Sequence, residues 1–258
     1  MLAAQGRVTS TDGTAITFER AGAGPALVMV DPAGGWSGFD NIRGLGRALA
    51  SDLTVFTYDR RGRGTSGDRA PYAVEREIED LEAVIGEAGG SASVYGFSSG
   101  ALVALHGAAA GLAIRKLVLF EPPIREAGEP PDVAFADRLA TLIAEGRRAE
   151  AVTLFLTSIG VPDEVIEGMG PARDALEAVA HTLVYDAEIS NAMTDEVIRS
   201  VPVPTLVLDS QGSSDDLTGG TAALVAALPN AIRRSLAGEW HGVPDEVLAP
   251  VVKEFLGA

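Results

Sequence analysis

The stretch Val94-Tyr95-Gly96-Phe97-Ser98-Ser99-Gly100 joins an apolar run to an Ala- and Leu-rich run that begins at Ala101. This order predicts a strand, a sharp turn and a helix, with Ser98 in the turn. Gly-x-Ser-x-Gly in that setting is typical of a nucleophile elbow, in which the serine hydroxyl projects above the sheet edge from a strained backbone. Gly96 and Gly100 have no Cβ, so strand and helix can approach closely. We therefore predict that Ser98 is a nucleophile; the alternative is a Gly/Ser loop that only joins two core elements.

The composition limits the classes of protein to consider. The 258 residues, 47% of them hydrophobic, suffice for one α/β domain with or without an insertion. A net charge of −16 argues against binding nucleic acid or an anionic membrane surface. The absence of cysteine excludes thiolate catalysis, disulfides and cysteine metal ligands. No signal-peptide core precedes Thr9, and the longest apolar run is too short to span a bilayer, so we expect a cytoplasmic protein.

Strand and helix patterns alternate at both ends of the chain but not in its middle. Apolar runs predict two strands within 7–20 and further strands at 26–30, 54–58, 93–97, 116–120, 204–209 and 232–236. Helices are predicted at 42–50, 74–88, 101–110, 221–228 and 246–256. Residues 132–199 show only helical patterning. The chain is therefore predicted to be an α/β protein with a mostly parallel, doubly wound sheet and an inserted helical cap. We expect the core to comprise 1–123 and 201–258, and the cap 124–200.

Serine is a poor nucleophile without a base, so one of the three histidines must lie near Ser98. His106 lies two turns down the helix that follows Ser98 and is expected to point away from it. His181 falls in the predicted cap, where it could line a pocket, although a structural role is favoured. His241 follows the last predicted strand, and doubly wound sheets place active-site residues at the carboxyl ends of their strands. We predict that His241 is the base.

Taken together, these motifs resemble the α/β-hydrolase-fold superfamily, in the form of a serine hydrolase with a small helical cap. The motifs that carry the resemblance are 96–100, 58–66, 204–208 and His241 before the C-terminal helix. They follow the family's order and span most of the chain. The resemblance implies that the segment Tyr58-Asp59-Arg60-Arg61-Gly62-Arg63-Gly64-Thr65-Ser66 is a turn that braces the sheet near the site, with its arginines in structural roles.

The chain departs from the family after the strand at 26–30. Related enzymes often carry His-Gly there, whereas this chain has Asp31-Pro32. The family's oxyanion donor is a backbone N–H just after that pair, which maps to Ala33. Proline lacks an N–H but lies one residue too early to remove this donor. The resemblance thus implies an oxyanion hole formed by the backbone N–H groups of Ala33 and Ser99. A carboxylate at Asp31 would disfavour a developing anion and raises the chance of an unusual reaction.

The second departure concerns the acid that orients His241. The family's usual position maps near Ser213, which is not acidic; Asp209, Asp215 and Asp216 lie close by but would each need a shifted loop. Haloalkane-dehalogenase-like members instead place the acid after the strand that follows the nucleophile helix, which here is Glu121. The dehalogenases and epoxide hydrolases of this fold use an aspartate nucleophile, so Ser98 argues against both activities. Glu121 is our predicted acid, with the three aspartates as alternatives.

The resulting functional prediction is a serine hydrolase that cleaves a small to medium uncharged or apolar ester, lactone or thioester through an acyl-serine. No cofactor is implied, and the histidines lack the spacing of metal ligands. Candidate pocket residues are Trp36, Phe97, His181 and Tyr185. One alternative is a biosynthetic enzyme on the same scaffold, such as a cyclase, acyltransferase or C–C hydrolase; another is a non-enzymatic small-molecule receptor. The sequence leaves the substrate and the oligomeric state open.

Overall fold

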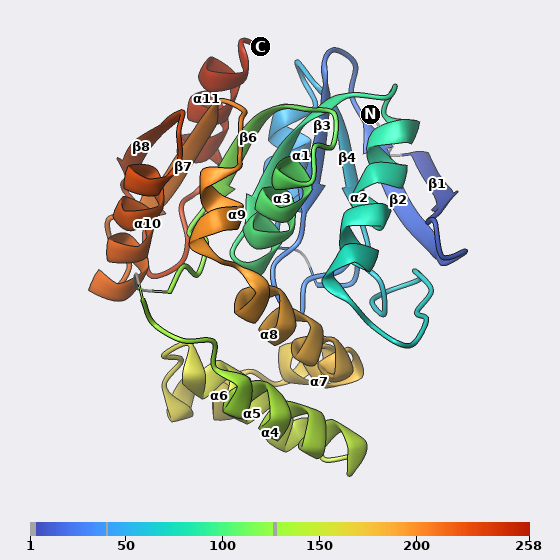
Figure 1. The fold of residues 1–258 in the computed structure, drawn as a ribbon, viewed down its shortest axis with the longest axis vertical. Coiled ribbons are helices and arrows are strands. Elements are labelled where there is room, and N and C mark those ends of the chain that lie inside the picture. Colours follow the sequence, from blue (N-terminus) through green and yellow to red (C-terminus); the bar gives the residue numbers. More distant parts are fainter. Residues whose placement is uncertain (1–3, 40, 126–127) are drawn as a thin grey trace.

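The computed structural model describes residues 4–39, 41–125 and 128–258 and organises them around one sheet of eight strands (Figure 1). In spatial order the strands are β1-β2-β4-β3-β5-β6-β7-β8. Their bounds are β1 (Ala4–Thr9), β2 (Ala15–Ala21), β3 (Ala26–Val30), β4 (Thr54–Tyr58), β5 (Ala92–Phe97), β6 (Ile114–Phe120), β7 (Thr205–Ser210) and β8 (Ala231–Leu236). The first two strands form a hairpin and β2 pairs antiparallel with β4, while the remaining pairs are parallel. The mostly parallel sheet predicted from the sequence is confirmed.

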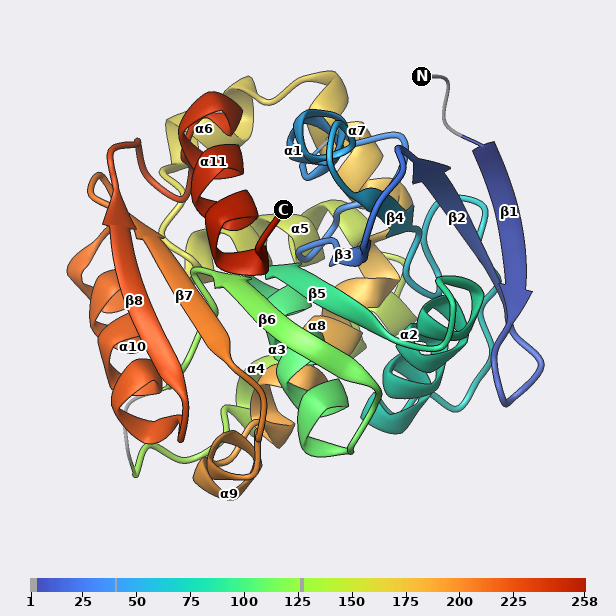
Figure 2. The same ribbon diagram turned by 90° about the horizontal axis from the view of Figure 1, so that it is seen from above.

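Helices cover both faces of this sheet (Figure 2). One face carries α1 (Arg43–Leu49) and α11 (Asp245–Leu256), and the other carries α2 (Val74–Glu87), α3 (Ser99–Ala109) and α10 (Asp215–Ala227). Alternate residues of one strand pack into opposite layers, because successive strand side chains point to opposite faces. Leu27 and Met29 of β3 pack with α1 and α11, whereas Val28 and Val30 pack with α2 and α3.

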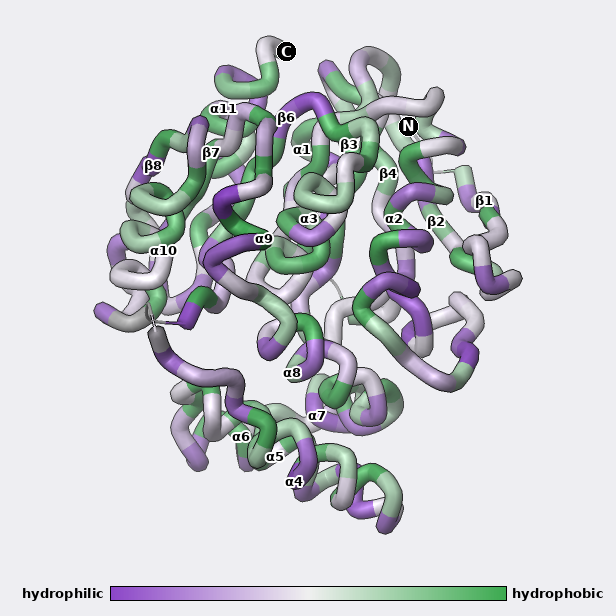
Figure 3. Tube along the Cα trace, in the orientation of Figure 1, coloured by the Kyte–Doolittle hydropathy of each residue, from purple (hydrophilic) through white to green (hydrophobic). Residues whose placement is uncertain are grey.

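The central strands are buried on both faces, which is why their sequences are continuous apolar runs. Every residue of β3 and β4 is buried. Helix α3 is buried from Ser99 to Ala108, and Figure 3 shows this helix and the central strands as mostly hydrophobic. Strand β5 lies in the middle of the sheet and the first turn of α3 is buried, so a reactive side chain between them can be positioned rigidly.

Helix α10 differs from the sequence-based expectation, since it begins at Asp215 and not near Thr221. Gly219 and Gly220 lie in its first turns, and glycine is a weak helix former. The apolar pattern becomes helical only after them, so the start of the helix could not be read from periodicity.

Between β6 and β7 the described residues form helices and no strand. We call this set the inserted helices: α4 (Val133–Ala144), α5 (Arg148–Ser158), α6 (Asp163–Gly168), α7 (Pro171–Ala178), a 3-10 turn (Ala180–Thr182), α8 (Leu183–Ala192) and α9 (Asp195–Arg199). Helices α4–α7 gather beyond one end of the sheet (Figure 1) and share a hydrophobic cluster with the first half of α8. Ile189 in the second half of α8 and Met193 just after its end share a hydrophobic cluster with α3, so α8 joins the two layers. No described helix is both long and apolar enough to cross a membrane.

Candidate active site

Ser98 lies in a tight turn between β5 and α3, with backbone angles φ 51° and ψ −122°. A non-glycine residue in this region of backbone space carries strain of about 1–3 kcal/mol, so the surrounding structure must impose it. The flanking glycines explain how. A Cβ on Gly96 would lie 2.5 Å from Cα of Ala101, and one on Gly100 would lie 2.4 Å from the carbonyl oxygen of Val30. Both positions therefore require glycine, and the strand-turn-helix geometry expected from the sequence is present.

His241 lies in the loop between β8 and α11, and Glu121 directly follows β6. Oε2 of Glu121 is 2.5 Å from Nδ1 of His241. Oε1 of the same carboxylate accepts hydrogen bonds from the backbone N–H of Ser210 at 2.7 Å and from the hydroxyl of Ser213 at 2.6 Å. Burial alone would raise the pKa of Glu121, but these hydrogen bonds and the contact with His241 hold that pKa below its usual value. Glu121 is thus a buried, ionised carboxylate on the imidazole.

Ser213 occupies the place where the family's usual acid was expected. Its hydroxyl donates to Glu121 and accepts a hydrogen bond from the backbone N–H of His241 at 2.9 Å. The serine therefore ties the histidine loop to the carboxylate. From the sequence, Ser213 was noted only because the family usually has an acidic residue at this position. A serine hydroxyl can both donate and accept a hydrogen bond, and this property was the one sign in the sequence of a bridging role.

Ser98, Glu121 and His241 also share a backbone property. Among the described residues they are the three non-glycine positions with positive φ, at 51°, 44° and 53° respectively. Residues held in such conformations cluster at active sites, because the strain persists only where packing enforces it. The three side chains selected from the sequence thus coincide with the three strained positions.

The alternative acids lie in other environments. Asp209 is fully buried, and its Oδ2 is 2.6 Å from Nε of Arg233. Asp215 is an exposed residue in the first turn of α10. The side chain of Asp216 lies outside what the structure describes.

A cavity of about 530 Å³ lies between the sheet edge and the inserted helices, and Ser98 and His241 both line it. Of the pocket residues expected from the sequence, Phe97 lines the cavity, whereas Trp36, His181 and Tyr185 do not. His181 and Tyr185 instead contact Asp68, with Nε2 of His181 at 3.4 Å and the Tyr185 hydroxyl at 2.9 Å from Oδ2. Trp240, which the sequence did not single out, lines the cavity beside His241.

Ala33 and Ser99 line the same cavity. Neither backbone N–H has a hydrogen-bond acceptor among the described residues, so both donors are available to a ligand. The side chain of Asp31 does not line the cavity; it is fully buried, and its Oδ2 is 3.0 Å from Nη1 of Arg43. Burial raises the pKa of Asp31 to about 6, against the opposing effect of Arg43.

His106, expected to point away from Ser98, is buried on α3, and its Nε2 lies 3.4 Å from the carbonyl oxygen of Ile189. Burial lowers the pKa of His106. Within the described residues no group of three His, Asp or Glu side chains could hold a metal ion.

The sequence model of the alpha/beta hydrolase family matches residues 22–251, which is most of the chain. The chain belongs to this family. Among solved structures, an alpha/beta hydrolase from Sphaerobacter thermophilus DSM 20745 is 43% identical, with a TM-score of 0.90 over 97% of this chain and all of that one. This level of identity agrees with the family assignment, and the predicted superfamily is confirmed.

More distant solved structures share the fold alone. An enol-lactonase from Burkholderia xenovorans LB400 is 19% identical, with a TM-score of 0.76 over 98% of this chain and 100% of that chain. A thermophilic esterase from Thermogutta terrifontis is 20% identical, with a TM-score of 0.73 over 99% of this chain and 98% of that chain. No curated protein sequence matches the chain significantly.

Proposed function

We propose that this alpha/beta hydrolase is a serine hydrolase that cleaves a small to medium apolar ester, lactone or thioester through an acyl-serine intermediate. The observation that carries the proposal is the buried carboxylate of Glu121 on Nδ1 of His241, together with Ser98 and His241 lining one cavity. A nucleophile, a base and an orienting acid are the parts that serine-based acyl transfer requires.

In the proposed reaction, Oγ of Ser98 attacks the carbonyl carbon while its proton passes to Nε2 of His241. Glu121 fixes the imidazole with its proton on Nδ1 and stabilises the imidazolium that forms. The carbonyl oxygen becomes an anion that accepts hydrogen bonds from the free N–H groups of Ala33 and Ser99. The C–O or C–S bond then breaks, and the leaving alkoxide or thiolate takes the proton from His241. Water attacks the acyl-serine in the same manner, which releases the acid and restores Ser98.

The walls of the cavity support an apolar substrate. Most of its side chains are aliphatic or aromatic, including Phe39, Phe97, Phe135, Phe155, Leu156 and Leu183. The volume of about 530 Å³ lies within the usual range for small-molecule pockets, about 300–1,000 Å³. The inserted helices supply many of these side chains, so we propose that residues 124–200 act as a cap that shapes the acyl pocket.

Hydrolysis is favoured over the biosynthetic alternative by the orientation of Asp31. From the sequence, the carboxylate of Asp31 was expected near the oxyanion donor, where its negative charge would disfavour the oxyanion of a hydrolytic reaction. In the structure, the Asp31 carboxylate pairs with Arg43 and does not line the cavity, so it does not count against hydrolysis.

Covalent labelling tests the proposal directly. A fluorophosphonate probe should label the wild-type protein at Ser98, identified by mass spectrometry of the modified peptide, and should not label Ser98→Ala. p-Nitrophenyl butyrate should be hydrolysed by the wild type, and prior labelling should abolish that hydrolysis. A wild-type protein that remains unlabelled, or a probe attached elsewhere with ester hydrolysis intact, would overturn the proposed function and favour a binding pocket.

A further inference from the structure

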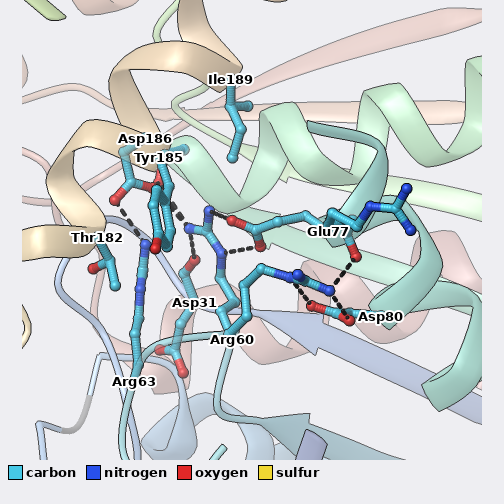
Figure 4. A network of polar contacts seen from close by, with 12 residues as sticks. Asp31, Arg60, Arg63, Glu77, Asp80, Thr182, Tyr185, Asp186 and Ile189 are labelled. Atoms are coloured by element: carbon cyan, nitrogen blue, oxygen red, sulfur yellow. Dashed lines mark hydrogen bonds and ion pairs between the residues drawn. The ribbon is translucent and has the colours of Figure 1, made fainter. Parts of the chain in front are cut away.

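Three charged side chains connect an inserted helix to the two segments that carry the candidate oxyanion donors (Figure 4). Asp186 lies on α8, and Arg60 and Arg63 lie in the turn after β4. All three are buried, with exposed fractions of 3%, 0% and 1%. The sequence analysis assigned the arginines a bracing role and did not single out Asp186.

Arg63 bridges α8 and the loop after β3. Its Nη2 is 2.7 Å from Oδ2 of Asp186, and its Nη1 donates to the carbonyl oxygen of Pro32 at 2.6 Å. That carbonyl and the N–H of Ala33 belong to the same peptide unit. Because a trans peptide is planar, its C=O and N–H point in opposite directions. Holding the Pro32 oxygen therefore fixes the direction of the Ala33 N–H.

Arg60 and Asp186 hold the second segment. The hydroxyl of Ser99 donates to Oδ1 of Asp186 at 2.8 Å and accepts from Nη1 of Arg60 at 3.2 Å. The same Nη1 donates to the carbonyl oxygen of Asp31 at 3.2 Å and lies 2.9 Å from Oδ1 of Asp186. Asp186 is thus the point at which the loop after β3 and the first residue of α3 are joined.

The charges of this group balance. Arg60 also forms a two-pronged pair with Glu77 of α2, through Nε at 2.8 Å and Nη2 at 2.7 Å, so two arginines meet two carboxylates. Burial would raise the pKa of Asp186, but the charges of Arg63 and Arg60 and the Ser99 hydrogen bond hold that pKa below its usual value. The carboxylate is ionised, and replacing it with a neutral group leaves Arg63 without its anionic partner.

We propose that Asp186 is a positioning residue for the oxyanion hole: through Arg63 and Ser99 it fixes the two backbone N–H groups that would receive the substrate oxyanion. The inserted helices thereby supply a part of the catalytic apparatus as well as the pocket wall. This inference rests on the proposed serine hydrolase function. It predicts that loss of the Asp186 charge lowers kcat more than it changes KM, because an oxyanion donor acts mainly in the transition state.

The same turn provides a matched control. Arg61 is fully buried and forms a two-pronged pair with Asp80 of α2, at 2.8 Å for both Nε and Nη2. Among the described residues, the hydrogen bonds of this pair reach Asp12 and the carbonyl oxygen of Arg76, but neither the loop after β3 nor Ser99. Asp80→Asn therefore removes one buried carboxylate from an arginine without disturbing the oxyanion segments.

The experiment compares Asp186→Asn with Asp80→Asn in the full-length protein, with thermal unfolding of each variant measured in parallel. Removing an oxyanion-hole donor costs about 10²–10³ in kcat, so displacing the donors should lower kcat of Asp186→Asn by about 10- to 100-fold. KM should change less than about threefold. The rate of fluorophosphonate inactivation should fall in parallel, since that reaction also builds negative charge on oxygen in the hole. Asp80→Asn should keep kcat and the inactivation rate within about threefold of wild type at a comparable loss of Tm.

A second pair covers the case in which Asp186→Asn does not fold. Arg63→Lys keeps the positive charge, but an ammonium cannot span Asp186 and the Pro32 carbonyl as the guanidinium fork does. It should lower kcat and the inactivation rate, and Arg61→Lys should not. The inference would be overturned if Asp186→Asn matched Asp80→Asn, and Arg63→Lys matched Arg61→Lys, in both kcat and inactivation rate. If Ser98 were still labelled in these variants, the proposed function would remain intact. Failure of the wild type to label at Ser98 would instead overturn the proposed function.

Discussion

Replacing Glu121 with glutamine tests the assignment of the acid most sharply, because the structure fixes how the amide must lie. The Oε1 position receives the backbone N–H of Ser210, which can only donate, so the amide oxygen of glutamine must occupy this position. The amide NH2 then faces Nδ1 of His241. In the native protein this position is taken by Oε2 of Glu121, which is 2.5 Å from Nδ1. A donor at that place forces Nδ1 to accept, which puts the ring proton on Nε2. The imidazole is then in the tautomer that cannot take the proton of Ser98.

The wrong tautomer sets the size of the effect. In serine hydrolases the corresponding acid-to-amide change leaves the geometry intact and lowers kcat by about 10⁴. At 1.36 kcal/mol per tenfold change, this corresponds to about 5.4 kcal/mol of transition-state stabilisation. Glutamine retains the hydrogen bonds from Ser210 and Ser213, so we expect Glu121→Gln to remain folded. Its loss of unfolding free energy should be about 1–2 kcal/mol, or a Tm lowered by no more than ~5 °C.

The assay is hydrolysis of p-nitrophenyl butyrate at pH 7.5, with Tm measured for each variant. Asp209→Asn is the matched control, because Asp209 is also a fully buried carboxylate on a neighbouring strand but pairs with Arg233. Its activity should stay within about threefold of wild type if it remains folded, and the same is expected of Asp215→Asn and Asp216→Asn. A folded Glu121→Gln that retains more than a tenth of the wild-type kcat, or an equal loss in Asp209→Asn, would refute the reasoning.

Three further predictions concern the nucleophile, the pH profile and the turn. Ser98→Ala and His241→Ala should each lower kcat by about 10³-fold or more, and the double variant should cost little extra because the two act as a unit; additive losses would contradict this. Because the pKa of Glu121 is lowered in the folded protein, its ionised carboxylate stabilises the fold above the unfolded-state pKa of about 4.3. This contribution to folding stability is lost only as pH falls through the lower folded-state pKa. Above pH 5 the acid limb of kcat/KM should therefore contain no ionisation of Glu121 and should fit no more than one ionisation; two ionisations there would argue against an ionised Glu121. Gly100→Ala should destabilise the protein by several kcal/mol in thermal unfolding, since its Cβ would meet the backbone of Val30 at 2.4 Å. Gly219→Ala is the control: a Cβ there would have no neighbouring atom within 4 Å, so this variant should be neutral or stabilised by up to about 1 kcal/mol.

The sequence alone was enough to locate the strained turn and the sheet around it. At Gly96 a Cβ would meet Cα of Ala101, so this constraint acts within one short stretch of sequence. At Gly100 a Cβ would meet the carbonyl oxygen of Val30 in β3, which lies nearby only in the folded chain, but the Gly-x-Ser-x-Gly pattern itself is visible in the sequence. The continuous apolar runs of β3 and β4 likewise follow from burial on both faces, which each segment expresses by itself. Such local steric and hydrophobic requirements are written into short stretches of sequence, so they can be read without knowing the fold.

Only the tertiary structure could decide which distant side chains meet. Asp186 reaches Ser99 across 87 positions of sequence, and nothing in the pattern of α8 distinguishes it from a surface carboxylate. In the sequence, Ser213 was noted only because it replaces the family's usual acidic residue, yet in the structure it bridges Glu121 and the His241 loop. Tyr185, a residue that the sequence suggested for the pocket, instead stacks on Tyr72. Such contacts depend on how helices rotate and pack against the sheet, which is a collective outcome of the whole core and leaves no local signal in the chain.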